Sequence, residues 1–532
     1  MKISKYKKIS SALIALAIST VYSCKDFTEL NPLGSLSEST AFTTPSNIDL
    51  AVNGMYWQAA VGYYDPLNGT ALQSRGYPFG GASVEQADMR GEDLVNLQAF
   101  FQVTYESNIG PNTANNVNMW EQLYALINQC NVIIEGVDNA VEAGILNAED
   151  GNPYKGEALF LRALSHHELL LHFSRPYSDN PGTNLGVPYR TIAITGSASA
   201  AEANSMGRGN VQESYQKLIE DLDLAESLLP ATRTSNSTKI SRATKGAAIA
   251  LKTRVKLHMK DYSGVIAEAT KLGAAETSGN FSSTIGSFSL EADPSTPFLS
   301  YDNNKESIFS IAQSIVSSGG VNGAITSMFS PSQFNGRDLI GVSPNIYNAP
   351  FWLTSDLRKQ NLTFKQSVGS RPFVYVWKYR KIGDNNDWVP IIRYAEVLLN
   401  AAEAYSYSNN NAQALRLLNA VRDRSVGASN SYGTTPPADL KLAIYNERRI
   451  EFLGEGRRWG DIHRLAQTSY GYNGVPAKVL ASQLTSAVYD GVTIVSPSHP
   501  AKPYTDKSFL WPIPQTETDA NPTLRDQQNP GW

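Results

Sequence analysis

Cysteine is nearly absent from this chain, which contains only Cys24 and Cys130 among its 532 residues. So few cysteines exclude the disulfide framework that holds many small secreted proteins together. Cys130 lies in the stretch WEQLYALINQCNVII, where apolar and aromatic residues recur at helical spacing. We therefore expect Cys130 to be a buried free thiol that packs as a small hydrophobic side chain.

Clusters of basic residues are also lacking. The chain carries a formal net charge of −4, and no strongly basic run follows its first ten residues. Nucleic acid binding requires clustered Lys and Arg side chains that displace counterions from the phosphates. The composition therefore excludes a nucleic-acid-binding protein.

Familiar catalytic and metal-binding motifs are missing as well. The sequence has no G-x-S-x-G nucleophile elbow and no phosphate-binding G-x-x-x-x-G-K loop. The stretch HHELLLH places His167 and His172 five positions apart. On a helix these side chains diverge by about 140°, so they cannot hold one zinc ion. We expect core or surface histidines here, and we predict no catalytic residue, no metal and no cofactor.

The one apolar run near the N-terminus is short. A lysine-rich head, MKISKYKKIS, precedes SALIALAISTV at residues 11–21. Spanning a bilayer takes about 20 apolar residues, whereas a basic head before a short apolar core is typical of a secretory signal. Because Ser23 directly precedes Cys24, we predict a bacterial lipoprotein signal in residues 1–23 and a lipid on Cys24. An ordinary signal peptide with an incidental Cys24 is the alternative.

The apolar pattern beyond this leader predicts a mostly α-helical protein. Residues 251–273 and 398–422 each read as a helix, a polar turn and a second helix, in the style of a tetratricopeptide pair. Residues 24–44 read as a tether, and residues 62–112 and 274–388 are expected to form long loops with brief strands such as SIFSIAQ. Helices are expected at about 46–61, 113–137, 153–174, 211–229, 241–259, 262–273, 390–408, 411–425 and 438–454.

Charges of both signs alternate in IYNERRIEFLGEGRRWGDIHRL, residues 444–465, which we name the hallmark stretch. Interleaved charges favour internal ion pairing over an anion-binding site. The arginines of this stretch are Arg448, Arg449, Arg457, Arg458 and Arg464, and the acids considered with them are Glu447, Glu451, Glu455 and Asp461.

The hallmark stretch closely resembles the C-terminal signature of the SusD/RagB family, N-E-R-x-x-E-[FL]-x-x-E-G-x-R-[WF]-x-D-[IL]-x-R. Residues 389–405 resemble the helix before that signature, and residues 509–532 resemble the family's C-terminal tail. WEQLYALINQCNVII and LFLRALSHHELLLHF resemble its early helices, so the resemblance covers essentially the whole mature chain. The matching signature residues are Asn446, Glu447, Arg448, Glu451, Phe452, Glu455, Gly456, Arg458, Trp459, Asp461, Ile462 and Arg464.

The resemblance implies a mostly α SusD-like fold, with four tetratricopeptide-like helix pairs supporting an irregular, loop-rich lobe with short strands. This would be a single domain over residues 45–532, with its scaffold at about 46–61, 113–273 and 390–465. It also implies a lipid-anchored, surface-exposed protein of the outer membrane that is paired with a SusC-like TonB-dependent transporter.

The same resemblance implies a non-catalytic protein that captures oligosaccharides or polysaccharides for import. A RagB-like peptide-binding protein is the alternative, and a surface hydrolase is a remote one. Loops 75–101 and 298–358 correspond in order to the family's ligand-lining segments. For each aromatic residue there, packing under a loop is the competing interpretation, and the charges between residues 88 and 93 can equally form an ordinary ion-paired loop. The candidate ligand-binding residues are Tyr77, Phe79, Asp88, Arg90, Asp93, Tyr347, Phe351 and Trp352.

Overall fold

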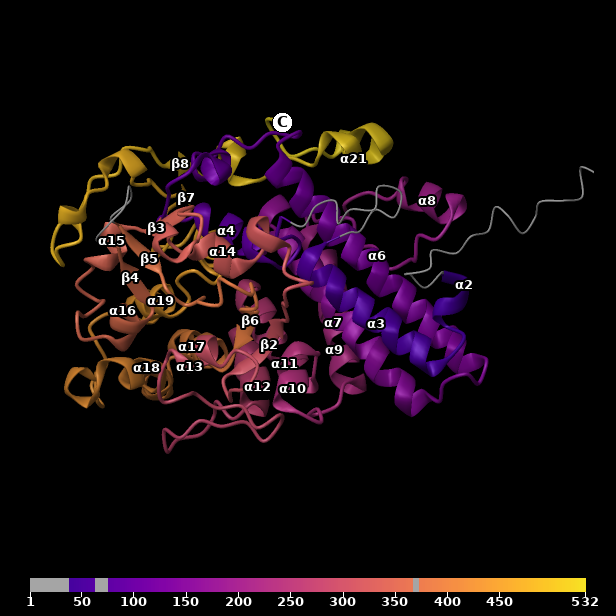
Figure 1. Cartoon of the computed structure of the whole chain (residues 1–532), viewed down its shortest axis with the longest axis horizontal. Coiled ribbons are helices and arrows are strands. Elements are labelled where there is room, and N and C mark those ends of the chain that lie inside the picture. The colour runs from indigo at the N-terminus through magenta and orange to yellow at the C-terminus, as the bar shows by residue number, and fades with distance from the viewer. Residues whose placement is uncertain (1–37, 63–74, 367–372) are drawn as a thin grey trace, which may run out of the picture.

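The computed structural model describes residues 38–62, 75–366 and 373–532. Figure 1 shows long helices at the right and along the lower side, short strands and helices gathered at the left, and the C-terminal segment running along the top. The predicted signal peptide and the predicted lipidation site at Cys24 lie outside the described residues. Among those residues, no helix combines the length and the apolar character that crossing a bilayer requires.

Long helices that follow one another in the chain form the scaffold. The scaffold helices are α3 (Pro45–Val61), α6 (Ala114–Glu142), α7 (Ala148–Phe173), α9 (Val211–Leu228), α10 (Asn236–Ser241), α11 (Lys245–His258), α12 (Tyr262–Lys271), α17 (Tyr394–Tyr407), α18 (Asn411–Val426) and α19 (Leu440–Glu451). From α6 onward, α6 packs on α7, α7 on α9, α9 on α11, α11 on α12, α12 on α17 and α17 on α18. Each predicted helix is present, with ends shifted by a few residues, so the helical prediction is confirmed.

Local sequence explains where these helices begin. At the start of α3, the Thr44 side chain accepts a hydrogen bond from the backbone N–H of Asn47, and Pro45 occupies the first turn, where its missing N–H costs nothing. Helix α9 begins with a capping box. The Asn210 side chain accepts from the N–H of Glu213, and the Glu213 carboxylate accepts from the N–H of Asn210.

Small residues let the scaffold pack closely. A Cβ atom placed on Gly136 of α6 would lie only 2.3 Å from the ring of Phe42, so no other residue fits there without displacing the ring. Gly156 of α7 is limited in the same way by Leu229, at 2.9 Å. Cys130 of α6 is fully buried and free, as predicted.

Short elements joined by long loops form the lobe. Its elements are α4 (Gly81–Met89), β1 (Leu94–Asn96), α5 (Gln102–Tyr105), α13 (Thr296–Leu299), α14 (Ile325–Phe329), β3 (Ile340–Val342), α15 (Pro344–Tyr347), α16 (Leu357–Asn361), β4 (Thr363–Lys365) and β5 (Val374–Val376). Strand β1 pairs antiparallel with β3, and β4 pairs antiparallel with β5. Because β3 also contacts β5, these four strands form one small frame that positions the surface loops.

Other short elements join the lobe to the scaffold and close the chain. Strand β2 (Ser307–Ile311), the SIFSI run predicted as a strand, pairs antiparallel with β6 (Val389–Arg393), directly before α17. The remaining elements are α2 (Glu38–Ala41), α8 (Ser197–Ala203), α20 (Arg458–Leu465), β7 (Gly474–Val475), β8 (Lys502–Pro503), α21 (Gln515–Ala520) and α22 (Pro522–Asp526).

Two expectations about secondary structure are wrong. Residues 62–112 are not loops throughout, because α4 occupies part of them. Every residue of α4 is buried, so its sequence has no wet face and therefore no helical period to recognise. The helix expected from residue 390 begins instead at Tyr394, because the preceding residues form β6. A short apolar run such as VPII does not by itself distinguish a strand from a helix.

Candidate functional site

The alternating charges of the hallmark stretch fold into a buried network of ion pairs. Arg448 Nε lies 2.9 Å from Asp461 Oδ2, and Arg464 Nη2 lies 2.8 Å from Asp461 Oδ1. Arg464 also reaches outside the stretch, with Nη1 2.5 Å from Glu403 Oε1 of α17. The prediction of internal ion pairing is therefore confirmed, and the network extends further than the sequence indicated.

Glu451 joins the lobe to the scaffold through this network. Its carboxylate oxygens lie 2.9 Å from Arg358, 2.7 Å from Arg393 and 2.8 Å from Arg424. Burial works against its charge, but the neighbouring cations outweigh burial and hold the pKa of Glu451 well below its ordinary value. Because Arg358 belongs to α16, Arg393 to β6 and Arg424 to α18, one carboxylate fixes three elements.

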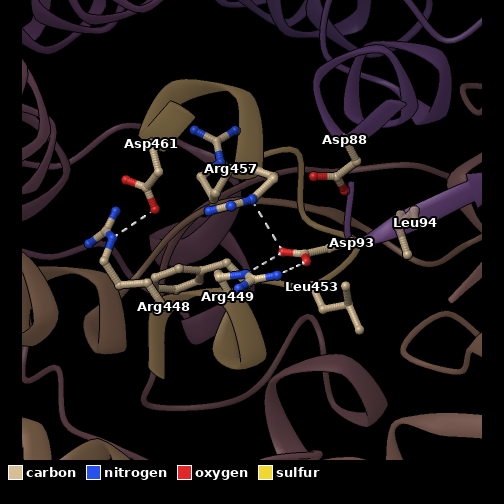
Figure 2. A pocket seen from close by; sticks show the side chains of 10 residues that line it. Asp88, Asp93, Leu94, Arg448, Arg449, Leu453, Arg457 and Asp461 are labelled. Atoms are coloured by element: carbon tan, nitrogen blue, oxygen red, sulfur yellow. Dashed lines mark hydrogen bonds and ion pairs between the residues drawn. The ribbon is translucent and has the colours of Figure 1, made fainter. Parts of the chain in front are cut away.

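Figure 2 shows a small cavity among these charges. Arg448 and Asp461 face each other across one side of it, and Arg449 points toward Asp93, with Nη2 2.5 Å from Oδ1. The cavity volume is about 10 Å³, which is room for about one water molecule. A sugar ring or a peptide does not fit, so this cavity is part of the structural network and not a ligand site.

Three predicted ligand residues, Asp88, Arg90 and Asp93, lie against the hallmark stretch, and each is only 3% exposed; of the three, Asp93 joins the ion-pair network. Asp88 accepts a hydrogen bond from the N–H of Gly456, and burial raises the pKa of its carboxyl to about 7. The guanidinium carbon of Arg90 lies 3.5 Å from the centre of the Trp459 ring. These side chains are therefore not open to a ligand, and their prediction as ligand-binding residues is wrong, because they hold α4 and β1 against the hallmark stretch; the ion-paired loop left as the alternative describes Asp93.

Two of the predicted aromatic residues are buried as well. Tyr77 is 1% exposed and its Oη accepts a hydrogen bond from Gln86 Nε2, while Phe79 is 4% exposed. Both pack into the main hydrophobic core, so their prediction as ligand contacts is wrong and the competing interpretation, packing beneath the surface, holds for them. Tyr347 and Phe351 are half-buried, and ligand contact at these two residues stays a prediction.

Trp352 is also buried, because only 2% of it is exposed. Its prediction as a ligand-binding residue is therefore wrong. The ammonium group of Lys359 donates hydrogen bonds to the carbonyl oxygens of Trp352 and Tyr347, at 2.7 and 2.6 Å. The same ammonium lies 5.1 Å from the centre of the Trp352 ring. The segment that carries α15 and α16 thus folds over the ring, which cannot present its face to a ligand in this structure.

The sequence reasoning missed three half-buried, partly accessible rings on the lobe, Phe334, Phe364 and Trp377, which we name the ring cluster. The ring centres of Phe334 and Trp377 are 4.5 Å apart, and those of Phe364 and Trp377 are 5.4 Å apart. Arg380 lies over Trp377 at 5.5 Å. The three rings come from separate segments, so no spacing in the sequence brings them together; their only signal was the aromatic content of a loop-rich region.

An open cleft of about 410 Å³ lies on the lobe at the end of β1. Its volume falls within the range of about 300–1,000 Å³ typical of small-ligand sites. One wall runs from the end of β1 through α5 to Glu106, and the other comes from the loop at residues 480–482. The lining residues are Asn96, Leu97, Gln98, Ala99, Gln102, Tyr105, Glu106, Leu480, Ala481 and Ser482.

The histidines of HHELLLH lie in separate buried surroundings. His167 packs edge-on against His258, with ring centres 4.9 Å apart. Nδ1 of His172 lies 3.0 Å from Nη1 of Arg90. Both side chains are fully buried, so of the core or surface positions expected for these histidines, both residues take core positions.

Comparison with known proteins gives a consistent match along the chain. A family model described as "SusD family" matches residues 298–532, and another described as "Starch-binding associating with outer membrane" matches residues 82–257. SusD-like protein P2 of Formosa agariphila is 25% identical over 581 aligned positions, which cover 99% of this chain and 100% of that protein.

Solved structures share the fold. A SusD superfamily protein from Bacteroides fragilis has 28% sequence identity and a TM-score of 0.72, covering 91% of this chain and 99% of its own. A surface glycan-binding protein A from Bacteroides fluxus has 21% identity and a TM-score of 0.65, covering 92% of this chain and 100% of its own. The mostly helical, SusD-like fold expected from the sequence is therefore confirmed.

Proposed function

The chain belongs to the SusD family, and from that premise we propose that it binds glycans at the cell surface without cleaving them and passes them to a SusC-like TonB-dependent transporter. One matching family model is described as starch-binding and associated with the outer membrane, and a structural relative is titled a surface glycan-binding protein. These descriptions support a glycan as the ligand class.

The ring cluster is the observation that carries the proposal. Sugar rings present apolar C–H faces, which pack favourably on exposed aromatic faces. Phe334, Phe364 and Trp377 are half-buried together on one small surface of the lobe, where each keeps part of its surface accessible. Scattered apolar side chains are normal on a protein surface, but a compact group of large rings is a frequent mark of a binding site.

The state of the carboxylates among the predicted ligand residues and beside them supports binding rather than hydrolysis. Glycosidases place two carboxyl groups on either side of the scissile bond. In the segment that follows α4, Glu92 and Asp93 are instead held by Arg458 and Arg449, and Asp88 is buried against Gly456. These acids serve the structural network and do not face a substrate.

An anchor at Cys24 completes the proposal. A lipid on this residue would keep the protein at the outer membrane, where a transporter partner would lie within reach. The family description supports an association with that membrane. The lobe would then present the ring cluster and the cleft to incoming glycans.

Calorimetry with Trp377→Ala tests the proposal. The purified protein is titrated with a panel of plant, host and microbial oligosaccharides and of short peptides. Stacking on one ring contributes about 1–3 kcal/mol by analogy with base stacking, so removing Trp377 should weaken glycan binding about 5- to 150-fold. Tyr262→Ala removes a half-exposed ring that stacks on Tyr407 in the scaffold, and this control should leave the affinity unchanged.

Three results would contradict the proposal. Binding of peptides but of no sugar would favour the RagB-like alternative. Shortened sugars in a chromatogram of the incubated mixture would identify a hydrolase. Equal glycan affinity in wild type and Trp377→Ala, with both proteins folded by circular dichroism, would remove the ring cluster from the binding surface.

A further inference from the structure

Among the described residues, the cleft at the end of β1 is lined by one acidic side chain and no basic one. Of the residues that line it within the described part of the chain, Glu106 alone carries a charge at neutral pH. Its remaining polar lining consists of amides and hydroxyls, including Asn96, Gln98 and Gln102. An anionic ligand would therefore meet one negative charge at the wall and no lysine or arginine.

Two basic residues near the cleft, Lys478 and His499, do not make it attractive to an anion. Lys478 is buried, and its ammonium donates hydrogen bonds to the carbonyl oxygens of Met89 and Tyr105, both at 2.7 Å. Those bonds tie the ammonium to backbone carbonyls, Lys478 is not among the residues that line the cleft, and burial lowers the pKa of Lys478 well below its ordinary value. His499 lies near Glu106, but burial lowers its pKa too, so it stays neutral at pH 7.

The hydrogen-bonding groups of the wall also favour one kind of ligand. A carboxylate only accepts hydrogen bonds, so the Gln102 group 2.9 Å from Glu106 Oε1 is its donor Nε2. Gln102 Oε1 then remains as an acceptor. Oδ1 of Asn96 is buried and has no hydrogen-bond partner in the described part of the chain. The wall thus offers acceptors, and a buried acceptor without a donor is costly.

We propose that this cleft binds a neutral, hydroxyl-bearing sugar unit and discriminates against sulfated and carboxylated sugars. This inference rests on the proposed glycan-binding function. Sugar hydroxyls would donate to Asn96 Oδ1, Gln102 Oε1 and Glu106, while the leucines at positions 97 and 480 would cover the apolar C–H face. Sulfate and carboxylate oxygens only accept, so they cannot satisfy these groups, and the charge of Glu106 repels them.

Paired polysaccharides provide the test. The purified protein is run through native gels that contain starch, xylan, galactomannan or laminarin, or a chemically sulfated copy of each. Retardation by at least one neutral polymer is expected, with affinity for its sulfated copy about 10-fold lower or weaker still at low salt. Glu106→Lys should remove most of this discrimination by strengthening the binding of the sulfated copy.

A matched control separates the cleft from net charge. Glu135 is exposed on α6 and does not line the cleft, so Glu135→Lys changes the net charge equally and should leave the discrimination intact. Equal or stronger retardation by the sulfated copies would overturn this inference while leaving glycan binding in place. The inference would also be overturned if Glu106→Lys and Glu135→Lys changed the discrimination between neutral and sulfated polymers equally. Retardation by no polymer of either kind would count against the proposed function itself.

Discussion

The Nη2 atom of Arg458 lies 2.5 Å from Oε1 of Glu92, and this ion pair joins α20 to the segment between α4 and β1. Asp93 is a second partner of Arg458, at 3.3 Å. Burial disfavours the negative charge of Glu92, but the positive charges of Arg458 and Arg449 outweigh burial and lower the pKa of Glu92 to about 2. Arg458 of the hallmark stretch thus connects two segments that are distant in the sequence.

We predict that Arg458→Ala lowers the free energy of unfolding by about 3–5 kcal/mol, because Arg449 is then left to neutralise both Glu92 and Asp93, and one buried negative charge stays uncompensated. Urea unfolding of both proteins measures the loss. Lys155 pairs with Asp138 at an exposed site, so Lys155→Ala should cost less than about 1 kcal/mol. Intrinsic glycan affinity should stay near normal in Arg458→Ala. An unchanged stability together with lost binding would reverse the assignment.

Most of the scaffold helices could be predicted from the sequence, but little of the candidate site could. Long helices such as α6 and α9 keep one apolar face over many turns, which a pattern search detects. Helix α4 is buried on every side and β6 is a short apolar run, so neither has a period that identifies it. The ion pairs of the hallmark stretch were predictable as a type, because the charges alternate. Their partners were not, because Glu92 and Glu403 are distant in the sequence.

The proposed binding surface was harder still to predict. A sequence shows that a region is rich in aromatic residues but not which rings the loops cover. Trp352 and Trp377 both lie in the lobe, yet the first is enclosed by the Lys359 segment and the second is partly accessible. Which ring remains accessible depends on tertiary contacts such as the hydrogen bonds of Lys359, and no local signal records them.

Trp352→Ala is therefore expected to act on stability. Truncating a buried tryptophan removes its packing and leaves a cavity, at a cost of about 3–5 kcal/mol. Thermal unfolding followed by fluorescence should show a clear drop in melting temperature, and Trp352→Phe should recover part of it. A folded Trp352→Ala protein with normal stability and weakened glycan affinity would return this residue to the ligand surface.

The anchor is tested by Cys24→Ala. Lipid chains on Cys24 would contribute about 0.8 kcal/mol per buried methylene group, so the wild-type protein should sediment with the outer membrane and the variant should be released. The host strain must lack the proposed transporter partner, which could otherwise retain the protein. Cys130→Ala alters the other cysteine, which is buried in α6, and should stay in the membrane fraction. A Cys24→Ala protein that still sediments would exclude the lipid anchor.

The buried histidines predict that the fold weakens in mild acid. Burial lowers the pKa of His166, His167 and His463 to about 3, whereas an unfolded histidine titrates near 6.5. Between these values the unfolded chain binds the additional protons, so stability falls as the pH drops below about 6.5. Each histidine contributes about 1.4 kcal/mol per pH unit. Asp88 opposes them, because its raised pKa of about 7 makes the folded state bind a proton between about pH 4 and 7.

Two variants separate these contributions when urea unfolding is compared at pH 7.5 and pH 5. His167 makes no hydrogen bond in the described part of the chain and packs against Tyr215 and His258, so His167→Phe keeps a ring of similar shape. The free energy of unfolding that is lost between pH 7.5 and pH 5, the acid loss, should be smaller in this variant by about 2 kcal/mol. This value is about 1.4 kcal/mol per pH unit over the 1.5 units from pH 6.5 to 5. Asp88→Asn should increase the loss by a similar or slightly larger amount, because the folded state no longer takes up the Asp88 proton. Stability equal at both pH values in wild type, or a His167→Phe protein with the full acid loss, would show that these histidines accept protons in the folded state.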